Sequence, residues 1–346
     1  RFNRTQSPFD GSDLGIFGTR TRDDRSLAGL DWTHMFSPTL LVEFRGGFSR
    51  SSQFERGEHQ GRDIATELGL PRLVREPEFQ DFPRITVRDH FELGTSASQP
   101  VQFHVTDIQY NNKFTWVKSK HVFKGGFDVS RVRYNQPYFN NQRGTYNFLG
   151  RWTNQPIGDL LLGLLNNTSR QMGFNRNYYR SISYGMFFND DWKVSRNLTL
   201  NLGLRYELNK PAVDRYDKLA NFVPGRNQLV VASAAGVPNL EELIAIAVLE
   251  GRVTTRQEAG LPRSLVYADL TNFAPRFGFA WRPLRSERTV LRGGYGIFYG
   301  GEILNPIRSA LSNNFPFAIN QTYNRQTNDP KLLTLTSPFP ETRARL

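Results

Sequence analysis

The side chains that most often bind metals or act as nucleophiles are sparse in this chain and are not spaced for either task. The sequence contains no cysteine, which removes thiolate zinc sites, cysteine nucleophiles and disulfide scaffolds together. The histidines show no i, i+4 or other spacing typical of metal ligands. They are His34, His59, His90, His104 and His121. The sequence therefore predicts neither a metal site nor a cofactor.

Two pairs of adjacent carboxylates and one glycine-rich run are the remaining candidates for chemistry. Asp23–Asp24 and Asp190–Asp191 would point to opposite sides of an extended strand, so neither pair forms an acid–base couple. The run "GGYGIFYGG" (293–301) contains Gly-x-Gly, but it looks like a strand and no helix follows it, unlike a dinucleotide fingerprint. No phosphate-binding loop or nucleophile elbow appears. We therefore expect that the protein is not an enzyme.

The composition narrows the class of protein further. Hydrophobic residues make up only 38% of the 346 residues, aromatic residues reach 13%, and no run approaches the roughly 18 apolar residues of a membrane-spanning helix. A transmembrane β-barrel is compatible with these values, because its strands alternate and its mean hydropathy resembles that of a soluble protein. The net charge is +12, but the 44 Lys and Arg residues are dispersed and form no basic block, so no nucleic-acid partner is predicted.

Alternation of apolar and polar residues is clearest in "DDWKVSRNLTLNLGLRYE" (190–207). Successive side chains of a strand point to opposite sides, so this run predicts a strand with two different surfaces. One surface carries Leu198, Leu200, Leu202, Leu204, Tyr206 and Leu208, and the other carries Thr199, Asn201, Gly203, Arg205 and Glu207. In this phase Asp190 shares the apolar side with Phe188 and Trp192, unless a local bulge shifts it.

Four of the five tryptophans end similar strand-like runs, and a short polar turn and a second alternating run follow each of them. The tryptophans are Trp32, Trp116, Trp192 and Trp281. They predict four hairpins, near 25–52, 101–136, 177–209 and 271–301. A β-propeller would place a blade every ~40–50 residues, about half the spacing found here.

Long polar segments join these hairpins at the end opposite the short turns. They span about 52–100, 136–177 and 209–271, and two apolar pieces within them, 156–165 and 239–251, predict short helices. Short turns at one end and long loops at the other are typical of an outer-membrane barrel. We expect the tryptophans to form an aromatic girdle at the membrane interface, although aromatic residues packed in the core of a soluble protein are the alternative.

Polar residues on the opposite faces of the strands are the candidates for ligand contact in the lumen. These are Asp107, Lys113, Arg205, Glu207, Arg276 and Arg292. Outward apolar and inward polar side chains are what a lipid-exposed barrel requires.

Two segments resemble a known family. The runs "FFNDDWKVSRNLTLNLGLRYE" (187–207) and "NFAPRFGFAWRPLRSERTVLRGGYGIFYG" (272–300) resemble the barrel of TonB-dependent outer-membrane receptors, in particular the Oar-like group, and the resemblance covers about 25–301. It implies a barrel of about 22 strands filled by a plug and energised by the TonB complex. The ligand would be a bulky nutrient such as a carbohydrate, a siderophore or a peptide. A passive porin or structural surface protein and a soluble β-rich binding protein are the alternatives.

The expected fold is therefore all-β. We expect residues 1–346 to be a fragment of one antiparallel transmembrane β-barrel, with about eight strands, long extracellular loops and no plug domain. The first residues, "RFNRTQSPFDGSDLG", read like a loop. The expected partners are outer-membrane lipid, an unidentified ligand, and the TonB complex acting through a plug that this chain lacks. The expected location is the bacterial outer membrane.

Overall fold

A nine-stranded antiparallel sheet forms the body of the chain in the computed structural model, and its strands follow one another in the order β1-β2-β3-β6-β7-β10-β11-β15-β16. The structure describes residues 2–7, 17–138, 140–172, 175–233, 251–283, 289–300, 310–325 and 333–339. The sheet strands are β1 (Phe2–Gln6), β2 (Thr19–Ser37), β3 (Leu40–Gly57), β6 (Val101–Lys118), β7 (His121–Tyr138), β10 (Asn175–Lys193), β11 (Leu198–Asp214), β15 (Phe273–Trp281) and β16 (Leu291–Gly296).

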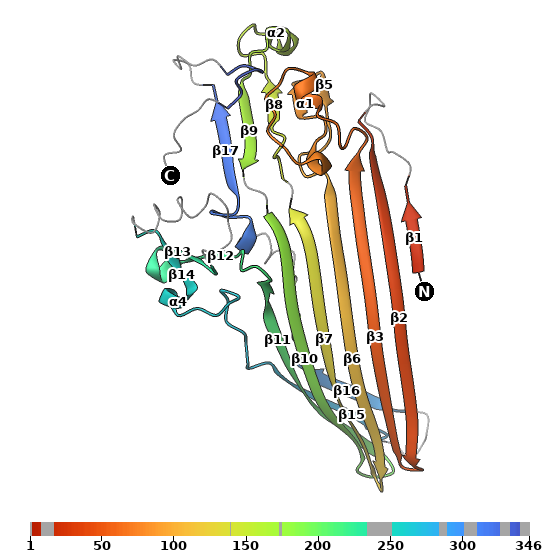
Figure 1. Cartoon of the computed structure of the whole chain (residues 1–346). Coiled ribbons are helices and arrows are strands. Elements are labelled where there is room, and N and C mark those ends of the chain that lie inside the picture. The colour runs from red at the N-terminus through yellow and green to blue at the C-terminus, as the bar shows by residue number, and fades with distance from the viewer. Residues whose placement is uncertain are drawn as a thin grey trace.

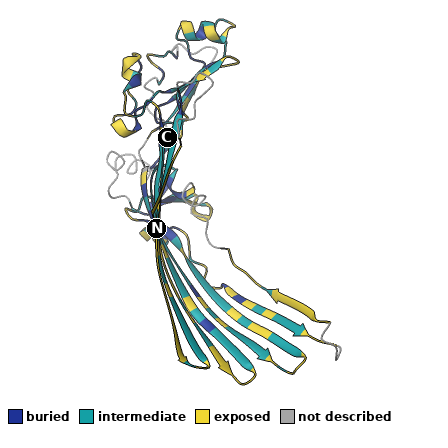
Figure 2. Ribbon diagram, turned by 90° about the vertical axis from the view of Figure 1, so that its right-hand side faces the viewer, coloured by how far each residue is buried: buried dark blue, intermediate teal, exposed yellow. Residues whose placement is uncertain are grey.

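All four predicted hairpins are present as neighbouring strand pairs, which confirms the antiparallel all-β prediction. Figures 1 and 2 show a curved sheet that stays open, with β1 and β16 as its edges in the described part of the chain. An open, curved, up-and-down sheet is consistent with part of a barrel. One expectation is wrong: Phe2–Gln6 is not a loop but pairs with β2 as a ninth strand.

Three of the four predicted turns are short, as expected, whereas residues 284–288 of the fourth lie outside the described residues. Two residues separate β2 from β3 and β6 from β7, and four separate β10 from β11. In the second of these turns Ser119 has a φ of 55°, the left-handed conformation that tight hairpin turns require.

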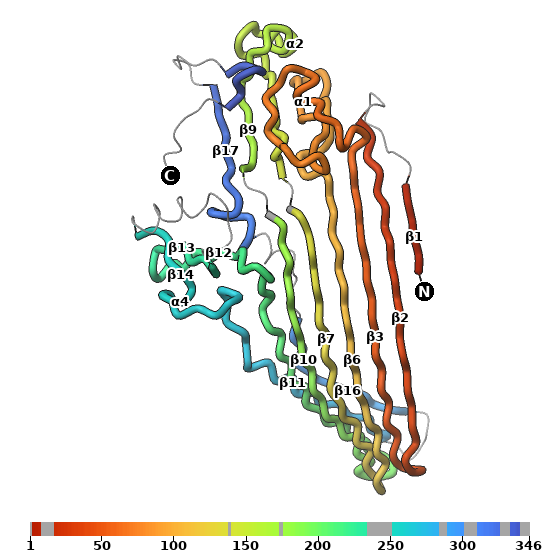
Figure 3. The backbone as a smooth tube through the Cα atoms, viewed as in Figure 1, coloured from red at the N-terminus to blue at the C-terminus, as the bar shows by residue number. Residues whose placement is uncertain are grey.

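The long segments at the other end are more ordered than their composition suggests, and they fold into two small sheets near the loop ends of the long strands (Figure 3). A five-stranded sheet has the order β17-β9-β8-β4-β5, and a three-stranded sheet has the order β12-β13-β14. The strands are β4 (Arg84–Val87), β5 (Phe91–Leu93), β8 (Thr145–Phe148), β9 (Asn167–Met172), β12 (Ala220–Val223), β13 (Gln228–Val231), β14 (Val253–Thr255) and β17 (Ile319–Asn324). We call this part of the molecule the loop layer.

Short helices complete the loop layer. The helix predicted within 156–165 is α2 (Pro156–Leu161), whereas residues 239–250 of the second predicted helix lie outside the described residues. The others are α1 (Ile64–Glu67), η1 (Pro77–Phe79), η2 (Pro224–Arg226) and α4 (Arg256–Ala259). Within the described ranges, no helix is both long and apolar enough to cross a bilayer.

The buried hydrophobic clusters lie in the loop layer and the adjoining ends of the strands. One surrounds Tyr146 and Phe148 of β8, and another joins Tyr179 and Ala212, near the loop ends of β10 and β11, to Leu219 and Val230. Among the described residues, no such cluster includes a side chain from the turn-side halves of the sheet strands. The long strands therefore do not gain their stability from a water-excluding core of their own.

The apolar side chains of those strand halves are exposed instead. Directly paired residues of neighbouring strands point to the same side of a sheet. One register row crosses six strands as Phe277, Leu202, Asp190, Phe123, Trp116 and Leu40. We call the side that carries this row the apolar face and the other side the polar face. A contiguous exposed apolar surface of this extent requires a nonaqueous partner.

Asp190 lies on the apolar face, as the alternation predicted. The only register shift recorded between the described residues of β10 and β11 is at Arg180 and Ile182, so a bulge next to Asp190 is not the explanation. Its carboxylate oxygen Oδ2 lies 2.7 Å from Nδ1 of His121, and the His121 ring stacks on Phe123 and Trp192. A partner therefore stabilises this polar group on an otherwise apolar surface.

Replacing Leu202 by Arg is expected to impair folding into a bilayer, because an arginine at the midplane of a barrel's lipid face costs roughly 2–4 kcal/mol. Thr199→Arg, on the polar face of the same strand, should be much milder. The measurement is the fraction of each variant that refolds into phosphatidylcholine vesicles, read from its heat-modifiable electrophoretic mobility. Equal losses in the two variants would refute the assignment of the faces.

Candidate functional site

The polar face brings together the residues that the sequence singled out for ligand contact. One register row joins Arg205 of β11 to Lys113 of β6 through Phe187 and Gly126, and continues to Glu43 of β3. Neighbouring rows place Asp107, Glu207, Arg276 and Arg292 on the same side. All six candidates therefore share one face, although they are spread over four strands.

Arg205 and Glu207 are the only two of the six that form an ion pair with each other in the described part of the chain. The Arg205 Nε atom lies 2.6 Å from Glu207 Oε1, and its Nη1 lies 3.0 Å from Asp128 Oδ1 on β7. The Arg205–Asp128 pair passes over Gly185 of the intervening strand β10. A Cβ atom there would lie 2.6 Å from both oxygens of Asp128, so a methyl group would push the ends of the two paired side chains aside.

Two further charge groups line the polar face. Lys113 Nζ lies 2.8 Å from Glu43, and Arg45 lies 3.1 Å from Asp31 and 3.8 Å from Glu43. Closer to the turns, Lys124 lies 2.7 Å from Asp191, whose other oxygen accepts a hydrogen bond from Asn201. Alternation along one strand indicates which side a residue occupies but not which residues pair across strands, because pairing depends on register.

The other three candidates have different surroundings. Asp107 accepts hydrogen bonds from Gln109 and Ser130, and the Arg276 guanidinium lies 4.9 Å from the centroid of the Phe298 ring. Arg292 lies on the exposed strand β16. These three are therefore not part of the ion-pair groups around Arg205 and Lys113.

A hollow of about 410 Å³ opens on the polar face beside the ion pairs of Lys113, Arg45 and Asp128. Its polar lining comes from Glu43, Arg45, Gln109, Asn111, Lys113 and Asp128, and the ring of Phe187 adds an apolar surface. Paired charges, amides and one aromatic ring together suit a polar ligand that offers both hydrogen-bond donors and acceptors. In the residues that the structure describes, no group of three or more His, Cys, Asp or Glu side chains could hold a metal ion.

The four predicted girdle tryptophans all lie on the apolar face, on the turn-side parts of their strands. Trp32, Trp116 and Trp281 are exposed, whereas Trp192 is half-buried against His121. Lys118 places its ammonium 4.9 Å from the centroid of the Trp116 ring. An amphipathic ring next to a cation is the arrangement that suits a boundary between hydrocarbon and water.

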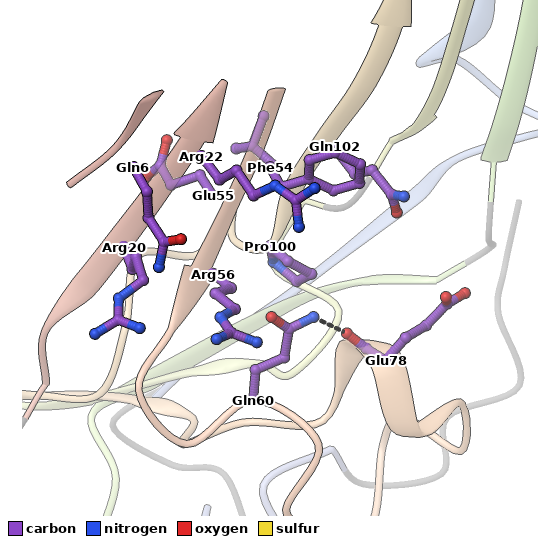
Figure 4. Close-up of a pocket in the computed structure, with 11 residues that line it drawn as sticks. Gln6, Arg20, Arg22, Phe54, Glu55, Arg56, Gln60, Glu78, Pro100 and Gln102 are labelled. Atoms are coloured by element: carbon purple, nitrogen blue, oxygen red, sulfur yellow. Dashed lines mark hydrogen bonds between the residues drawn. The ribbon is translucent and has the colours of Figure 1, made fainter. Parts of the chain in front are cut away.

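A second hollow, of about 310 Å³, lies at the loop end of β2, β3 and β6 (Figure 4). Arg20, Arg22, Phe54 and Arg56 line it, and Gln60 closes it by donating a hydrogen bond to the Glu78 carbonyl oxygen. Arg22 pairs directly with Phe54, on the apolar-face side of the sheet. This hollow therefore opens on the opposite side from the charged groups of the polar face.

One buried arginine connects two segments of the loop layer. Arg143 donates hydrogen bonds to the Gln99 and Ser96 carbonyl oxygens and to the Thr95 hydroxyl, at 2.7 to 3.0 Å. Burial lowers the pKa of Arg143 to about 10, and the nearby Asp81 opposes this shift. Burial also raises the pKa of the Asp81 carboxyl. The order of the loop layer thus depends on a desolvated cation that is held by backbone carbonyls.

Gly185→Ala is expected to lower the free energy of unfolding by about 1 kcal/mol, because the new methyl group displaces the Arg205–Asp128 pair. Gly29→Ala on β2 is the matched control, since its Cβ would meet only the Gly46 carbonyl oxygen at 3.7 Å. Urea unfolding of each variant in vesicles gives the comparison. In the Arg205→Gln background the cost of Gly185→Ala should disappear; an unchanged cost would contradict the assigned role of the glycine.

Arg143→Met should loosen the segments 58–100 and 140–172 without detaching the sheet strands, because it removes the hydrogen bonds that join them. Limited proteolysis of the membrane-inserted protein measures this, and cleavage in both segments should become at least about fivefold faster. Arg62→Met, which removes only an exposed ion pair with Glu67, is the control. Equal cleavage rates for the two variants would show that Arg143 does not hold the layer together.

The comparisons with known proteins give a family. A family model described as "Outer membrane beta barrel domain" matches residues 1–345. No curated protein matches the sequence. Among solved structures, the outer membrane transporter YddB from Escherichia coli is similar at 13% identity and a TM-score of 0.45, over 94% of this chain and 32% of that chain. The copper transporter OprC is similar at 13% identity and a TM-score of 0.34, over 85% of this chain and 39% of that chain.

The chain thus spans about a third of the length of these two structures. The family model covers nearly every residue of the chain. The nine-stranded sheet is antiparallel and curved, and one of its faces exposes apolar side chains. The chain belongs to the outer membrane beta barrel domain family and is a protein of the bacterial outer membrane, in contact with its lipid.

Proposed function

We propose that this chain is part of a TonB-dependent outer-membrane receptor of the Oar-like group, which takes up a bulky nutrient across the outer membrane. The observation that carries the proposal is the polar face, on which paired charges and amides surround a hollow of about 410 Å³. A carbohydrate, a siderophore or a peptide is the ligand class that suits such a surface, because each offers many donors and acceptors.

In the proposed mechanism the loop layer and the polar face bind the ligand, and the sheet itself does no chemistry. Asp107, Lys113, Arg205, Glu207, Arg276 and Arg292 are the proposed lumen contacts. The exposed pair of Arg45 and Asp31 can exchange partners with a passing polar ligand at small cost, since exposed pairs are worth about 1 kcal/mol or less. A plug moved by the TonB complex would then open the path.

In this proposal residues 1–346 are a portion of a single barrel domain. Its four hairpins would present one face to lipid and the other to the lumen. Trp32, Trp116, Trp192 and Trp281 would then form the girdle at the interface nearer the short turns. A passive porin would use the same two faces, and it differs from a receptor in leaving the lumen open at rest.

Ion conductance separates these two functions. The full-length protein, inserted into a planar lipid bilayer with concentrated KCl on both sides, is expected to show no steady current, because a plug fills the lumen of a receptor at rest. K⁺ and Cl⁻ are the probes. A stable open conductance in the intact protein would refute the receptor and favour the porin, whatever the ligand is.

A further inference from the structure

The apolar face changes character about halfway along the long strands. On β6 the side chains of this face are Trp116, Phe114, Asn112, Tyr110 and Ile108, followed by Thr106 and His104. The apolar stretch from Trp116 to Ile108 corresponds to about 27 Å of extended strand, close to the 9–11 residues that a barrel strand needs to cross a bilayer. The strands have 17 to 19 residues, so their loop-side halves project beyond the hydrocarbon.

Cations occupy the position at which this face leaves the hydrocarbon. One register row joins Arg50 of β3, Thr106 of β6, Arg133 of β7 and Arg180 of β10. The adjacent row on the turn side contains Arg131 of β7 and Lys210 of β11. We call these five positively charged residues the cationic rows.

In the described part of the chain, no carboxylate forms an ion pair with a residue of the cationic rows. Neither row contains an acidic residue, and Arg50, Arg131 and Arg133 are exposed and make no recorded ion pair. Arg131, Arg133 and Arg215 lie close enough to repel the charge of Arg180. Asp214, which attracts Arg180, is fully buried and accepts hydrogen bonds from the backbone N–H groups of Tyr178 and Tyr216.

Aromatic rings fix the depth of the cationic rows. The next row toward the turns carries Tyr110 and Tyr184, and the ammonium of Lys210 lies 5.7 Å from the centroid of the Tyr184 ring. Tyrosines collect where the hydrocarbon ends and the headgroups begin. The cationic rows lie next to these tyrosines on the side of the long loops, so they face the headgroup layer there. The long loops of outer-membrane barrels are extracellular, so this headgroup layer belongs to the outer leaflet.

From this arrangement we propose that Arg50, Arg131, Arg133, Arg180 and Lys210 bind the phosphate groups of a phosphorylated lipid of the outer leaflet. A guanidinium can bind a phosphate through two parallel hydrogen bonds, and several guanidiniums at one depth match a headgroup with more than one phosphate. The occupant is part of the surrounding membrane, because the site continues the lipid-facing surface without a break. Uptake of a nutrient through the lumen is not needed for this binding.

The test is a titration of the full chain, refolded in detergent, with diphosphorylated lipid A, followed by native mass spectrometry. Arg131→Gln/Arg133→Gln is expected to weaken the apparent affinity at least about tenfold, because it removes two charge-assisted contacts. Arg25→Gln/Lys193→Gln is the matched control. It removes the same charge from the polar face of β2 and β10 and should leave the affinity unchanged.

A second probe separates the phosphates from the acyl chains. Lipid A without its phosphates should bind wild-type protein and the Arg131/Arg133 variant equally weakly. The proposal is overturned if the variant binds diphosphorylated lipid A as tightly as wild type, if the control variant loses as much affinity, or if removal of the phosphates does not weaken binding to wild type. Heat-modifiable mobility confirms that each variant is folded before titration.

Discussion

Backbone hydrogen bonding between neighbouring strands is the constraint on which the other features depend. A bilayer offers no water to a free N–H or carbonyl group, so a strand that crosses it must be paired along its length. Once the register is set, every side chain is committed to one of two faces, and a slip of one residue would exchange them. The row that joins Leu202, Asp190 and Phe123 shows the consequence, since even the charged member keeps its phase and finds a partner in His121.

Local pattern was sufficient to predict the hairpins, the short turns and the two faces, because each follows from alternation within a single strand. The ion pairs were not predictable in this way. Arg205 and Asp128 belong to strands that do not touch each other, and they meet only because Gly185 leaves space above the strand between them. Neither the identity of the pair nor the role of the glycine is visible until three strands are placed in register.

The strands of the loop layer were not predicted from the sequence, for a related reason. Segments rich in Gly, Pro and Asn suggest irregular loops, and β4, β8 and β9 are too short to stand out from such a background. They become strands because segments distant in the chain supply their neighbours: β17 pairs with β9, and β4 pairs with β8. The strand β1 was missed in the same way, since its five residues gain their structure from β2 alone.

The buried clusters and the exposed apolar residues lie in two different parts of the molecule, and these parts have different surroundings. Other protein atoms bury Tyr146, Phe148 and Leu165, whereas Leu202 and Leu204 of β11 are exposed on the apolar face. The cluster that joins Tyr179 and Ala212 to Leu219 and Val230 is the place where the two parts share a buried core. Substitutions elsewhere in the loop layer can therefore change the external surface with little effect on the energetics of the turn-side halves of the sheet strands.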